Sequence, residues 1–301
     1  MLKVKTPPIK SQGIKTKLVP WIASAIPEGF SGRWIEPFMG TGVVGLNLAP
    51  ERAILCDINP HLINFYQALA SDRIIPATVK AHLEREGDKL RSLGEVHYYY
   101  MRDRFNETGD PLDFLFVNRA GFNGMIRFNR KGGFNIPFCR KPNRFAQAYV
   151  TKITNQTLWA YQTIKTKHFE FHCQDFEATV AMAEDGDIIY CDPPYIDRHV
   201  DYFSSWDDGH ERRLAGLLAQ SPAKFILSSW HHNDFRSNDY MKLLWSRFEI
   251  ATRDHFYHVG GREENRNPVV EALVTNYPLH PAMNGDASKV MLNEQFALLV
   301  D

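Results

Sequence analysis

A glycine-rich turn between a strand and a helix is the sequence feature that most limits how this chain can fold. Residues 33–38 (RWIEPF) form a short apolar run, and Gly40-Thr-Gly42-Val-Val-Gly45 follows it directly. Apolar spacing then predicts a helix over 43–48, a second strand over 52–56 and a helix that begins at Asn59-Pro60. This β-α-β-α order predicts an α/β fold with a parallel sheet.

The rest of the chain predicts an interruption of that sheet. Further strands are expected at 168–173, 187–191 and 224–228, with a last β pair around 256–259 and 269–276. Residues 71–161 lack this alternation and are expected to be mostly helical. The simplest organisation is one α/β domain with an inserted helical module.

Composition excludes several classes of protein. The chain has 301 residues, 44% of them hydrophobic, which is enough for one large domain or two modest ones. We find no apolar run of the roughly 18 residues that a membrane helix needs, and no secretory signal. The four cysteines are widely spaced without a C-x-x-C pair, which favours reduced thiols in the cytoplasm and no metal site.

Charge is segregated although the totals cancel, with 35 basic and 35 acidic residues. Residues 1–20 hold five lysines and no acid, and residues 117–152 hold eight cations and no acid. In the second segment the cations alternate with phenylalanine, asparagine and glycine. These residue types contact phosphates, stack on bases and bind base edges, so the segment predicts contact with nucleic acid rather than a merely solvated face.

The glycine turn and the acid after the next strand predict a nucleoside-containing cofactor. Gly40-x-Gly42-x-x-Gly45 lets backbone approach such a ligand closely, and Asp57 lies where a carboxylate can bind the ribose hydroxyls. The glycines alone also fit NAD(P). Glu36 argues against that alternative, because a carboxylate there would repel a pyrophosphate but bind the ammonium group of S-adenosylmethionine.

A second motif, Asp192-Pro193-Pro194-Tyr195, follows the strand predicted at 187–191. Ligands bind at the carboxyl ends of strands in open α/β sheets. The Asp192 carboxylate and the Pro193 carbonyl can accept the two hydrogens of an exocyclic amine, and Tyr195 can stack on its base. The motif therefore predicts modification of a nucleobase amine.

Together these segments resemble a known family. EPFMGTGVVGLNL (36–48), CDINPHLINFY (56–66), FVNRAGFNGMIRFNRKGGFNIPF (116–138), FHCQDF (171–176) and YCDPPY (190–195) stand in the order found in Dam-type DNA adenine-N6 methyltransferases of the alpha group. The resemblance covers about residues 5–280. It implies a Rossmann-like S-adenosylmethionine-dependent methyltransferase sheet with an inserted target-recognition domain.

The resemblance also implies a role for individual residues. It assigns the catalytic pocket for a flipped adenine to Asp192, Pro193, Pro194 and Tyr195. It implies that S-adenosylmethionine is surrounded by Lys10, Gly13, Lys15, Glu36, Pro37, Phe38, Gly40, Gly42, Asp57, Ile58, Asp175 and Phe176. The residues expected to contact duplex DNA are Arg119, Phe122, Asn123, Met125, Arg127, Asn129, Arg130, Lys131, Pro137, Arg140 and Lys141. Among these, Arg127 is expected to bind a guanine and Phe122 and Asn123 to fill the gap left by the flipped base.

The expected domains follow from the same resemblance. Residues 1–70 and 162–280 form the catalytic domain, 71–161 the target-recognition domain and 281–301 a C-terminal tail. We expect a monomer that methylates adenine N6 in a short site related to GATC, with a restriction endonuclease of the same specificity as a candidate partner. Three alternatives stay open: cytosine-N4 methylation, a nicotinamide-dependent oxidoreductase and a non-catalytic DNA-binding protein.

Overall fold

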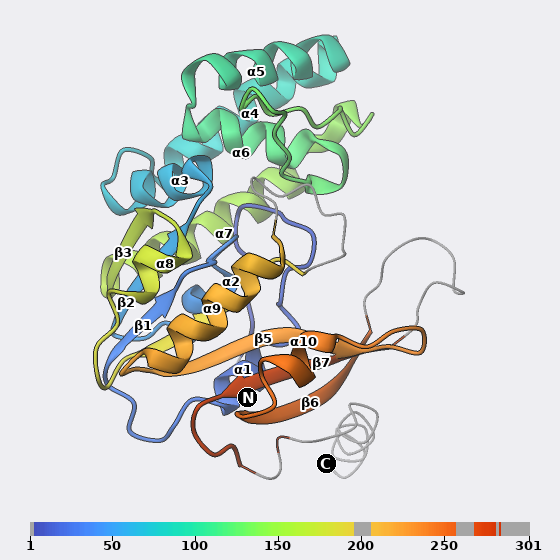
Figure 1. The fold of residues 1–301 in the computed structure, drawn as a ribbon. Coiled ribbons are helices and arrows are strands. Elements are labelled where there is room, and N and C mark those ends of the chain that lie inside the picture. Colours follow the sequence, from blue (N-terminus) through green and yellow to red (C-terminus); the bar gives the residue numbers. More distant parts are fainter. Residues whose placement is uncertain (1–2, 196–205, 257–267, 281–282, 284–301) are drawn as a thin grey trace, which may run out of the picture. The chain divides into compact units, whose positions relative to one another are not determined.

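The computed structural model describes residues 3–195, 206–256, 268–280 and 283 (Figure 1). Two predictions from the sequence lie largely outside this range, the strand around 256–259 and the tail 281–301. The described residues divide into two compact units. The first comprises 3–20 and 33–179, and the second comprises 21–32, 180–195, 206–256, 268–280 and 283.

The first unit contains three parallel strands in the order β3-β2-β1. They are β1 (Arg33–Glu36), β2 (Arg52–Asp57) and β3 (His168–Cys173). Helix α2 (Val43–Leu48) connects β1 to β2, and α3 (Pro60–Ala70) follows β2. The first strands and helices thus lie where the sequence predicts them. Parallel pairing explains why Trp34, Ile35 and Leu55 are all fully buried.

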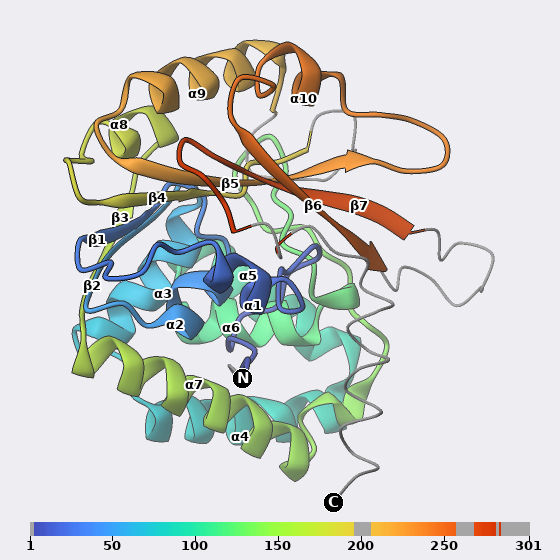
Figure 2. The same ribbon diagram turned by 90° about the horizontal axis from the view of Figure 1, so that it is seen from below.

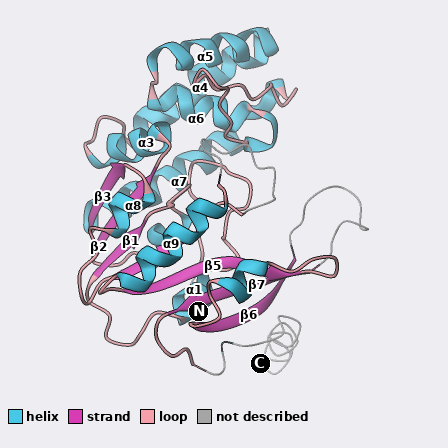
Figure 3. Ribbon diagram, in the orientation of Figure 1, coloured by secondary structure: helices cyan, strands magenta, loops and turns pink. Residues whose placement is uncertain are grey.

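Helices make up most of the chain between β2 and β3, as expected (Figure 3). They are α4 (Pro76–Leu93), α5 (Glu95–Thr108), α6 (Pro111–Ala120) and α7 (Gln147–Thr166), with short 3-10 turns at Phe122–Gly124 and Pro142–Phe145. Proline at the first helical position begins α4 and α6, and the Asp110 side chain caps α6. Figure 2 shows α4 and α7 side by side. Helix α7 continues past residue 161, the expected end of the inserted domain.

The second unit contains four strands in the order β4-β5-β7-β6. Strands β4 (Ile188–Cys191) and β5 (Lys224–His232) are parallel, whereas β7 (Pro268–Thr275) runs antiparallel to both β5 and β6 (Glu249–Phe256). The connecting helices are α9 (Asp208–Gln220) and α10 (Asp239–Leu243). Two short helices, α1 (Val19–Ser24) and α8 (Phe176–Val180), include the points where the chain passes from one unit to the other.

The position of β6 corrects one expectation. The sequence predicts a strand around 256–259, but β6 begins at Glu249 and occupies EIATRDHF. Only Ile250, Ala251 and Phe256 of its eight residues are apolar, and it pairs only with β7 among the described strands, at the edge of the sheet. A half-exposed edge strand has no continuous apolar run. The pattern of apolar residues therefore predicts a start of this strand that is too late in the sequence.

Helix α2 packs unusually closely on the strands beside it. A Cβ atom on Gly45 would lie 2.9 Å from Leu55 Cδ2 and 3.0 Å from Glu36 Oε1. The third glycine of the turn therefore permits close contact between helix and sheet, and a larger residue would displace the Glu36 carboxylate.

We expect Gly45→Ala to lower the free energy of unfolding by about 1–3 kcal/mol, because the added methyl group overpacks this contact. Gly216→Ala is a matched control: Gly216 lies in α9, and its added Cβ would meet nothing within 4 Å. That control should raise the free energy of unfolding by about 0.4–1 kcal/mol. Denaturant titration of both variants checks the difference, and equal effects would contradict the packing argument.

A buried carboxylate joins the helices of the first unit. Asp113 on α6 accepts hydrogen bonds from Arg104 Nε (2.6 Å) and Nη2 (2.5 Å) on α5, and His82 Nε2 on α4 lies 3.3 Å from Oδ1. Burial alone would raise the pKa of Asp113, but the bonds from His82 and Arg104 hold that pKa below its ordinary value.

We expect Asp113→Asn to lower the free energy of unfolding at pH 7 by about 3 kcal/mol, because Arg104 loses its anionic partner. A lowered carboxyl pKa contributes stability that is fully present above the pKa of the unfolded chain. This contribution is lost progressively as pH falls from about 4 through the lower pKa of the folded state. The difference between wild type and variant should therefore shrink in acid. Denaturant titrations at pH 7 and pH 3.5 measure it; a constant difference would show that the charge of Asp113 is not responsible.

Candidate active site and nucleic-acid interface

The glycine turn of the first unit is hydrogen-bonded to Asp57 at the end of β2. Asp57 Oδ2 accepts a hydrogen bond from the Gly40 N–H (2.9 Å), and Oδ1 accepts one from the Asn59 N–H (2.9 Å). Burial raises the pKa of Asp57, and the bonds from Asn59, Gly40 and Ile58 act in the opposite direction. A carboxylate has about four acceptor positions, so these backbone bonds leave capacity for a ribose hydroxyl.

Positive φ angles shape this turn. Gly40 has φ 49° and Gly42 has φ 71°, values that side-chain-bearing residues rarely adopt. The Gly42 N–H donates to the Met39 carbonyl, and the Met39 N–H donates to Cys56 at the end of β2. The turn thereby lies next to the end of β2, with Gly40 half-buried and Gly42 buried.

Glu36 is a buried acid directly before the turn. It is 1% exposed, and its Oε1 accepts a hydrogen bond from Trp34 Nε1 (2.7 Å). A buried carboxylate at the end of a strand is expensive to desolvate unless it is paired or binds a cation. The indole bond orients the group, and a buried carboxylate held in this way suits an ammonium ligand.

Two phenylalanines expected near the cofactor lie together. The rings of Phe38 and Phe176 stack with their centroids 5.7 Å apart, and Phe176 begins α8. Asp175 Oδ1 accepts the Ala178 N–H and so caps this short helix. Ile58, also expected at the cofactor, is 45% exposed after β2. These residues offer apolar surface for an adenine ring.

The N-terminal segment that contains Lys10 is fastened to α6. Asn118, which is 0% exposed, accepts the Lys10 N–H (2.8 Å) and donates to the Lys10 carbonyl (2.9 Å). Burial, Arg144, Arg119 and Lys152 all lower the pKa of the Lys10 ammonium, while Tyr149 acts in the opposite direction. Gly13 turns with φ 71°, and Lys15 is 5% exposed. All twelve residues expected around the cofactor, Pro37 included, belong to the first unit.

The Asp-Pro-Pro-Tyr motif lies in the second unit, immediately after β4. Tyr190 and Cys191 at the end of that strand are 1% and 0% exposed, whereas Asp192 is half-buried. The tetrapeptide therefore leaves the buried sheet at the carboxyl end of a parallel strand, as the sequence predicts.

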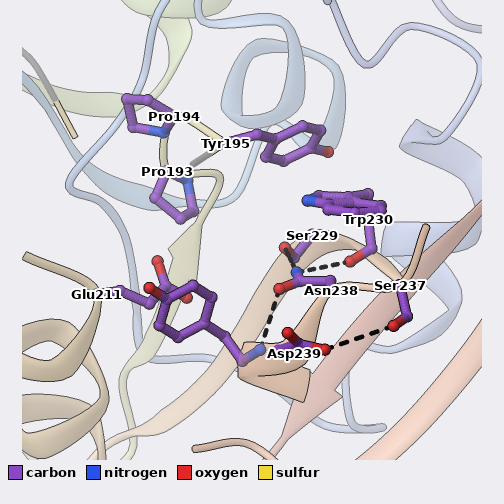
Figure 4. Close-up of a pocket in the computed structure, with 10 residues that line it drawn as sticks. Pro193, Pro194, Tyr195, Glu211, Ser229, Trp230, Ser237, Asn238 and Asp239 are labelled. Atoms are coloured by element: carbon purple, nitrogen blue, oxygen red, sulfur yellow. Dashed lines mark hydrogen bonds between the residues drawn. The ribbon is translucent and has the colours of Figure 1, made fainter. Parts of the chain in front are cut away.

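A cavity of about 80 Å³ adjoins this tetrapeptide (Figure 4). Pro193, Pro194 and Tyr195 line one side, and most of the remaining wall comes from the end of β5 and the start of α10. Asn238 donates to the Trp230 carbonyl (2.9 Å) and caps α10, which holds this wall in place. The Tyr195 hydroxyl donates to Glu271 Oε2 on β7 (3.0 Å).

The segment with the strongest family resemblance forms an irregular hairpin. Isolated antiparallel bridges join Gly121 to Phe138 and Phe128 to Phe134, and backbone bonds link 122 to 137 and 127 to 135. Phe134, Ile136 and Phe138 alternate inward and are buried. The Asn129 side chain accepts the N–H groups of Lys131 and Gly133 and so closes the turn.

Most residues expected to contact DNA lie on the accessible side of this hairpin. Phe122 is 50% exposed, and Asn123 adopts φ 54° next to it. Arg127 Nε donates to Asn135 Oδ1 (2.9 Å), which orients its guanidinium group. Met125 is half-buried. The other exposed members of the expected set are Asn129, Arg130, Lys131, Pro137, Arg140 and Lys141.

Arg119 differs from the rest of the expected set. It is 3% exposed, and its guanidinium group donates to the Pro8 carbonyl (2.7 Å), to the Tyr149 hydroxyl (3.1 Å) and to Gln156. Its place in a cation-rich run suggested a DNA contact, but on α6 its side chain points into the protein. We therefore assign Arg119 a structural role.

A groove of about 640 Å³ brings the two acid-free segments of the chain together. Lys5 and Thr6 line it from the N-terminal segment, and one face of α7 lines it from the other side. Lys5 Nζ lies 5.8 Å from the Trp159 ring. The described residues that line the groove are two cations, four other polar residues, an alanine and a tryptophan, with no acid: Lys5, Thr6, Ala148, Thr151, Lys152, Asn155, Gln156 and Trp159. Such a surface suits phosphate groups.

Sequence reasoning missed Asn118 and Glu271, which hold expected site residues from distant positions. Asn118 lies inside the 116–138 segment but the resemblance assigns it no role there, and Glu271 lies in none of the quoted segments; only the fold brings them to Lys10 and Tyr195. Over the described ranges, no cluster of three or more His, Cys, Asp or Glu residues suits a metal ion. Nor is any helix there long and apolar enough to cross a membrane.

Comparison with known proteins identifies the family. The family model for D12 class N6 adenine-specific DNA methyltransferases matches residues 11–259. The DNA adenine methylase of Haemophilus influenzae is 36% identical over 261 residues, which cover 81% of this chain and 86% of the relative. The DNA adenine methylase of Escherichia coli K12 is 34% identical over 237 residues, or 73% of this chain and 79% of that protein.

Two further proteins are similar to this chain. The DNA adenine methylase of Vibrio cholerae is 38% identical over 191 residues, covering 62% of this chain and 64% of the relative, which is less than two thirds of its length. An rRNA methyltransferase from Streptomyces viridochromogenes has 12% identity and a TM-score of 0.36, covering 90% of this chain and 88% of that one.

The family match spans the glycine turn, the hairpin and the Asp-Pro-Pro-Tyr motif, the three features on which the resemblance in sequence rests. This chain belongs to the D12 class of N6 adenine-specific DNA methyltransferases.

Proposed function

We propose that this protein transfers the methyl group of S-adenosylmethionine to N6 of an adenine in a short duplex DNA site. The observation that supports this most directly is the Asp192–Tyr195 tetrapeptide at the buried end of β4, in a chain of this family. The tetrapeptide combines two hydrogen-bond acceptors with an aromatic ring, the groups that an exocyclic amine on a flipped base requires.

The first unit has the residues to bind this cofactor. The backbone of the glycine turn and Asp57 suit its ribose, Glu36 suits its ammonium group, and Phe38 with Phe176 suits its adenine. Lys10 and Lys15 supply positive charge for its carboxylate. When bound, the cofactor supplies an activated methyl group on a sulfonium, so neither a metal ion nor a covalent enzyme intermediate is needed.

The protein's part in the reaction is positioning. The Asp192 carboxylate and the Pro193 carbonyl accept the two N6 hydrogens, which directs the nitrogen lone pair toward the methyl carbon. Tyr195 stacks on the base. Asp192 need not be a strong base, because the proton can leave after transfer.

The hairpin of the first unit is the proposed reader of the DNA site. Arg127, whose Nε donates to Asn135, supplies the guanidinium group for a bidentate contact to guanine, and Phe122 with Asn123 fills the place of the flipped adenine. Met125 and Pro137 make apolar base contacts, and the exposed cations bind phosphates. We keep residues 71–161 as the target-recognition domain and 1–70 with 162–280 as the catalytic domain.

The proposed setting is a monomer acting on cytoplasmic DNA, at a site related to GATC. A restriction endonuclease of the same specificity is the partner that the sequence resemblance suggests. Methyl transfer from labelled cofactor to unmethylated genomic DNA, with nucleoside analysis and site mapping, tests the whole proposal. N6-methyladenine in one short motif is the expected product; N4-methylcytosine, or no product despite cofactor binding, would refute it.

We expect Asp192→Ala to lower methyl transfer by about 100-fold or more and to leave cofactor affinity unchanged, because the N6 amine loses an acceptor. Single-turnover methylation measures the first quantity and equilibrium titration of S-adenosylmethionine measures the second. Near-normal turnover would remove Asp192 from the mechanism.

We expect Arg127→Ala to weaken discrimination at one guanine of the site by about 1–3 kcal/mol, because a bidentate base contact is lost. Lys152→Ala, in the cation-lined groove, is the comparison. This variant should weaken binding to all DNA sequences equally, and it should reduce the salt dependence of binding by about one phosphate contact. Binding titrations on site variants at several salt concentrations separate the two. If Arg127→Ala lowers the affinity for every DNA sequence equally, Arg127 has no role in base recognition.

A further inference from the structure

Glu271 is a buried acid that touches the tetrapeptide and belongs to no recognised motif. It lies in β7, it is 0% exposed, and its Oε2 accepts a hydrogen bond from the Tyr195 hydroxyl at 3.0 Å. The residues that follow it, Ala272, Leu273 and Val274, are fully buried and apolar. An apolar residue at position 271 would suit this strand better, because a buried carboxylate is expensive to desolvate.

The sheet places Glu271 in a row of residues with functional side chains. In the strand register it is opposite Trp230 on β5 and Arg253 on β6. Trp230 lines the cavity beside the tetrapeptide, and Arg253 brings a positive charge to the neighbouring strand at the same level. The carboxylate therefore lies at the level of the tetrapeptide cavity and reaches the one side chain that is expected to stack on the base.

We infer that Glu271 is a positioning residue for methyl transfer, acting through the hydroxyl of Tyr195. The inference rests on the proposed function. Glu271 fixes the plane of the Tyr195 ring, and its negative charge makes the face of that ring more electron-rich.

The chemistry of methyl transfer explains why the electron density of the Tyr195 ring matters. The N6 lone pair forms the bond to the methyl carbon while the carbon–sulfur bond breaks and its electron pair stays on sulfur. Positive charge thereby moves from sulfur onto the base until an N6 proton leaves to water. A ring face made more electron-rich attracts the base more strongly in the transition state than in the ground state, which is the condition for faster catalysis.

A second buried acid of the same unit provides the comparison. Glu211 accepts hydrogen bonds from Trp206 Nε1 (2.8 Å) and Trp245 Nε1 (3.0 Å), and burial raises its pKa. Glu211 thus resembles Glu271 in burial and in binding an aromatic donor. The donors to Glu211 are the indoles of Trp206 and Trp245 rather than Tyr195, so its effects should not depend on the tyrosine hydroxyl.

The test is a double-mutant cycle with Glu271→Gln and Tyr195→Phe. The glutamine retains an acceptor but removes the charge, and the phenylalanine retains the ring but removes the donor. Single-turnover methylation on a duplex site gives the rate, titration of S-adenosylmethionine gives cofactor affinity, and 2-aminopurine fluorescence at the target position reports base flipping.

We expect Glu271→Gln to lower the single-turnover rate about tenfold with cofactor affinity and flipping unchanged. In the Tyr195→Phe background the same change should alter the rate less than twofold, because the hydroxyl is already absent. Glu211→Gln should have the same effect in both backgrounds. A wild-type rate for Glu271→Gln, or an equal effect in both backgrounds, would overturn the inference.

Two controls keep the result interpretable. Thermal unfolding verifies that each variant is folded; if Glu271→Gln is not, Glu271→Asp takes its place in the cycle, since it keeps the charge but withdraws the acceptor by one methylene. Glu271→Asp should then also lose its effect in the Tyr195→Phe background, and an equal effect in both backgrounds would overturn the inference. If the wild-type protein itself methylates no DNA, the proposed function fails, and that result is distinct from a failed cycle in an active enzyme.

Discussion

The arrangement of the first unit depends on the Asp57 carboxylate, which accepts hydrogen bonds from the backbone N–H groups of Gly40 and Asn59. Asp57 ends β2, Gly40 begins the turn after β1, and Asn59 caps α3. One side chain therefore fixes the turn, the strand end and the next helix at once. The same carboxylate is the group that a ribose would meet, so the contact that shapes the fold also prepares the proposed cofactor site.

Buried acids recur at each point where this protein needs a defined side-chain position. Glu36 holds Trp34, Asp113 joins three helices, Glu211 binds two indoles and Glu271 binds Tyr195. Each carboxylate must be paired or hydrogen-bonded to offset its desolvation, so each one selects a single arrangement of its partners. Methyl transfer to an amine depends on positioning rather than on strong acid–base groups, and such an arrangement suits that requirement.

Sequence reasoning predicted the elements that are buried or punctuated by glycine and proline. The strands β1 to β5, the helix start at Asn59-Pro60 and the tetrapeptide at the end of β4 lie where expected. It missed the start of β6, because only three of the eight residues in that edge strand are apolar. It also failed for Arg119, because a cation-rich run does not reveal which member points inward. The family match confirmed the resemblance in sequence, while the roles of individual site residues stay predictions.

The sequence by itself determined the α/β class, the family and the short motifs, because these depend on local conformation and on residue type. Only the tertiary structure decided which distant side chains support them. Asn118 meets Lys10 across 108 residues, and Glu271 meets Tyr195 across 76. No local pattern encodes such pairs, since strand pairing and helix packing bring them together from distant parts of the chain. Burial then strengthens the requirement for each bond, because leaving a buried polar group unpaired costs about 1–3 kcal/mol.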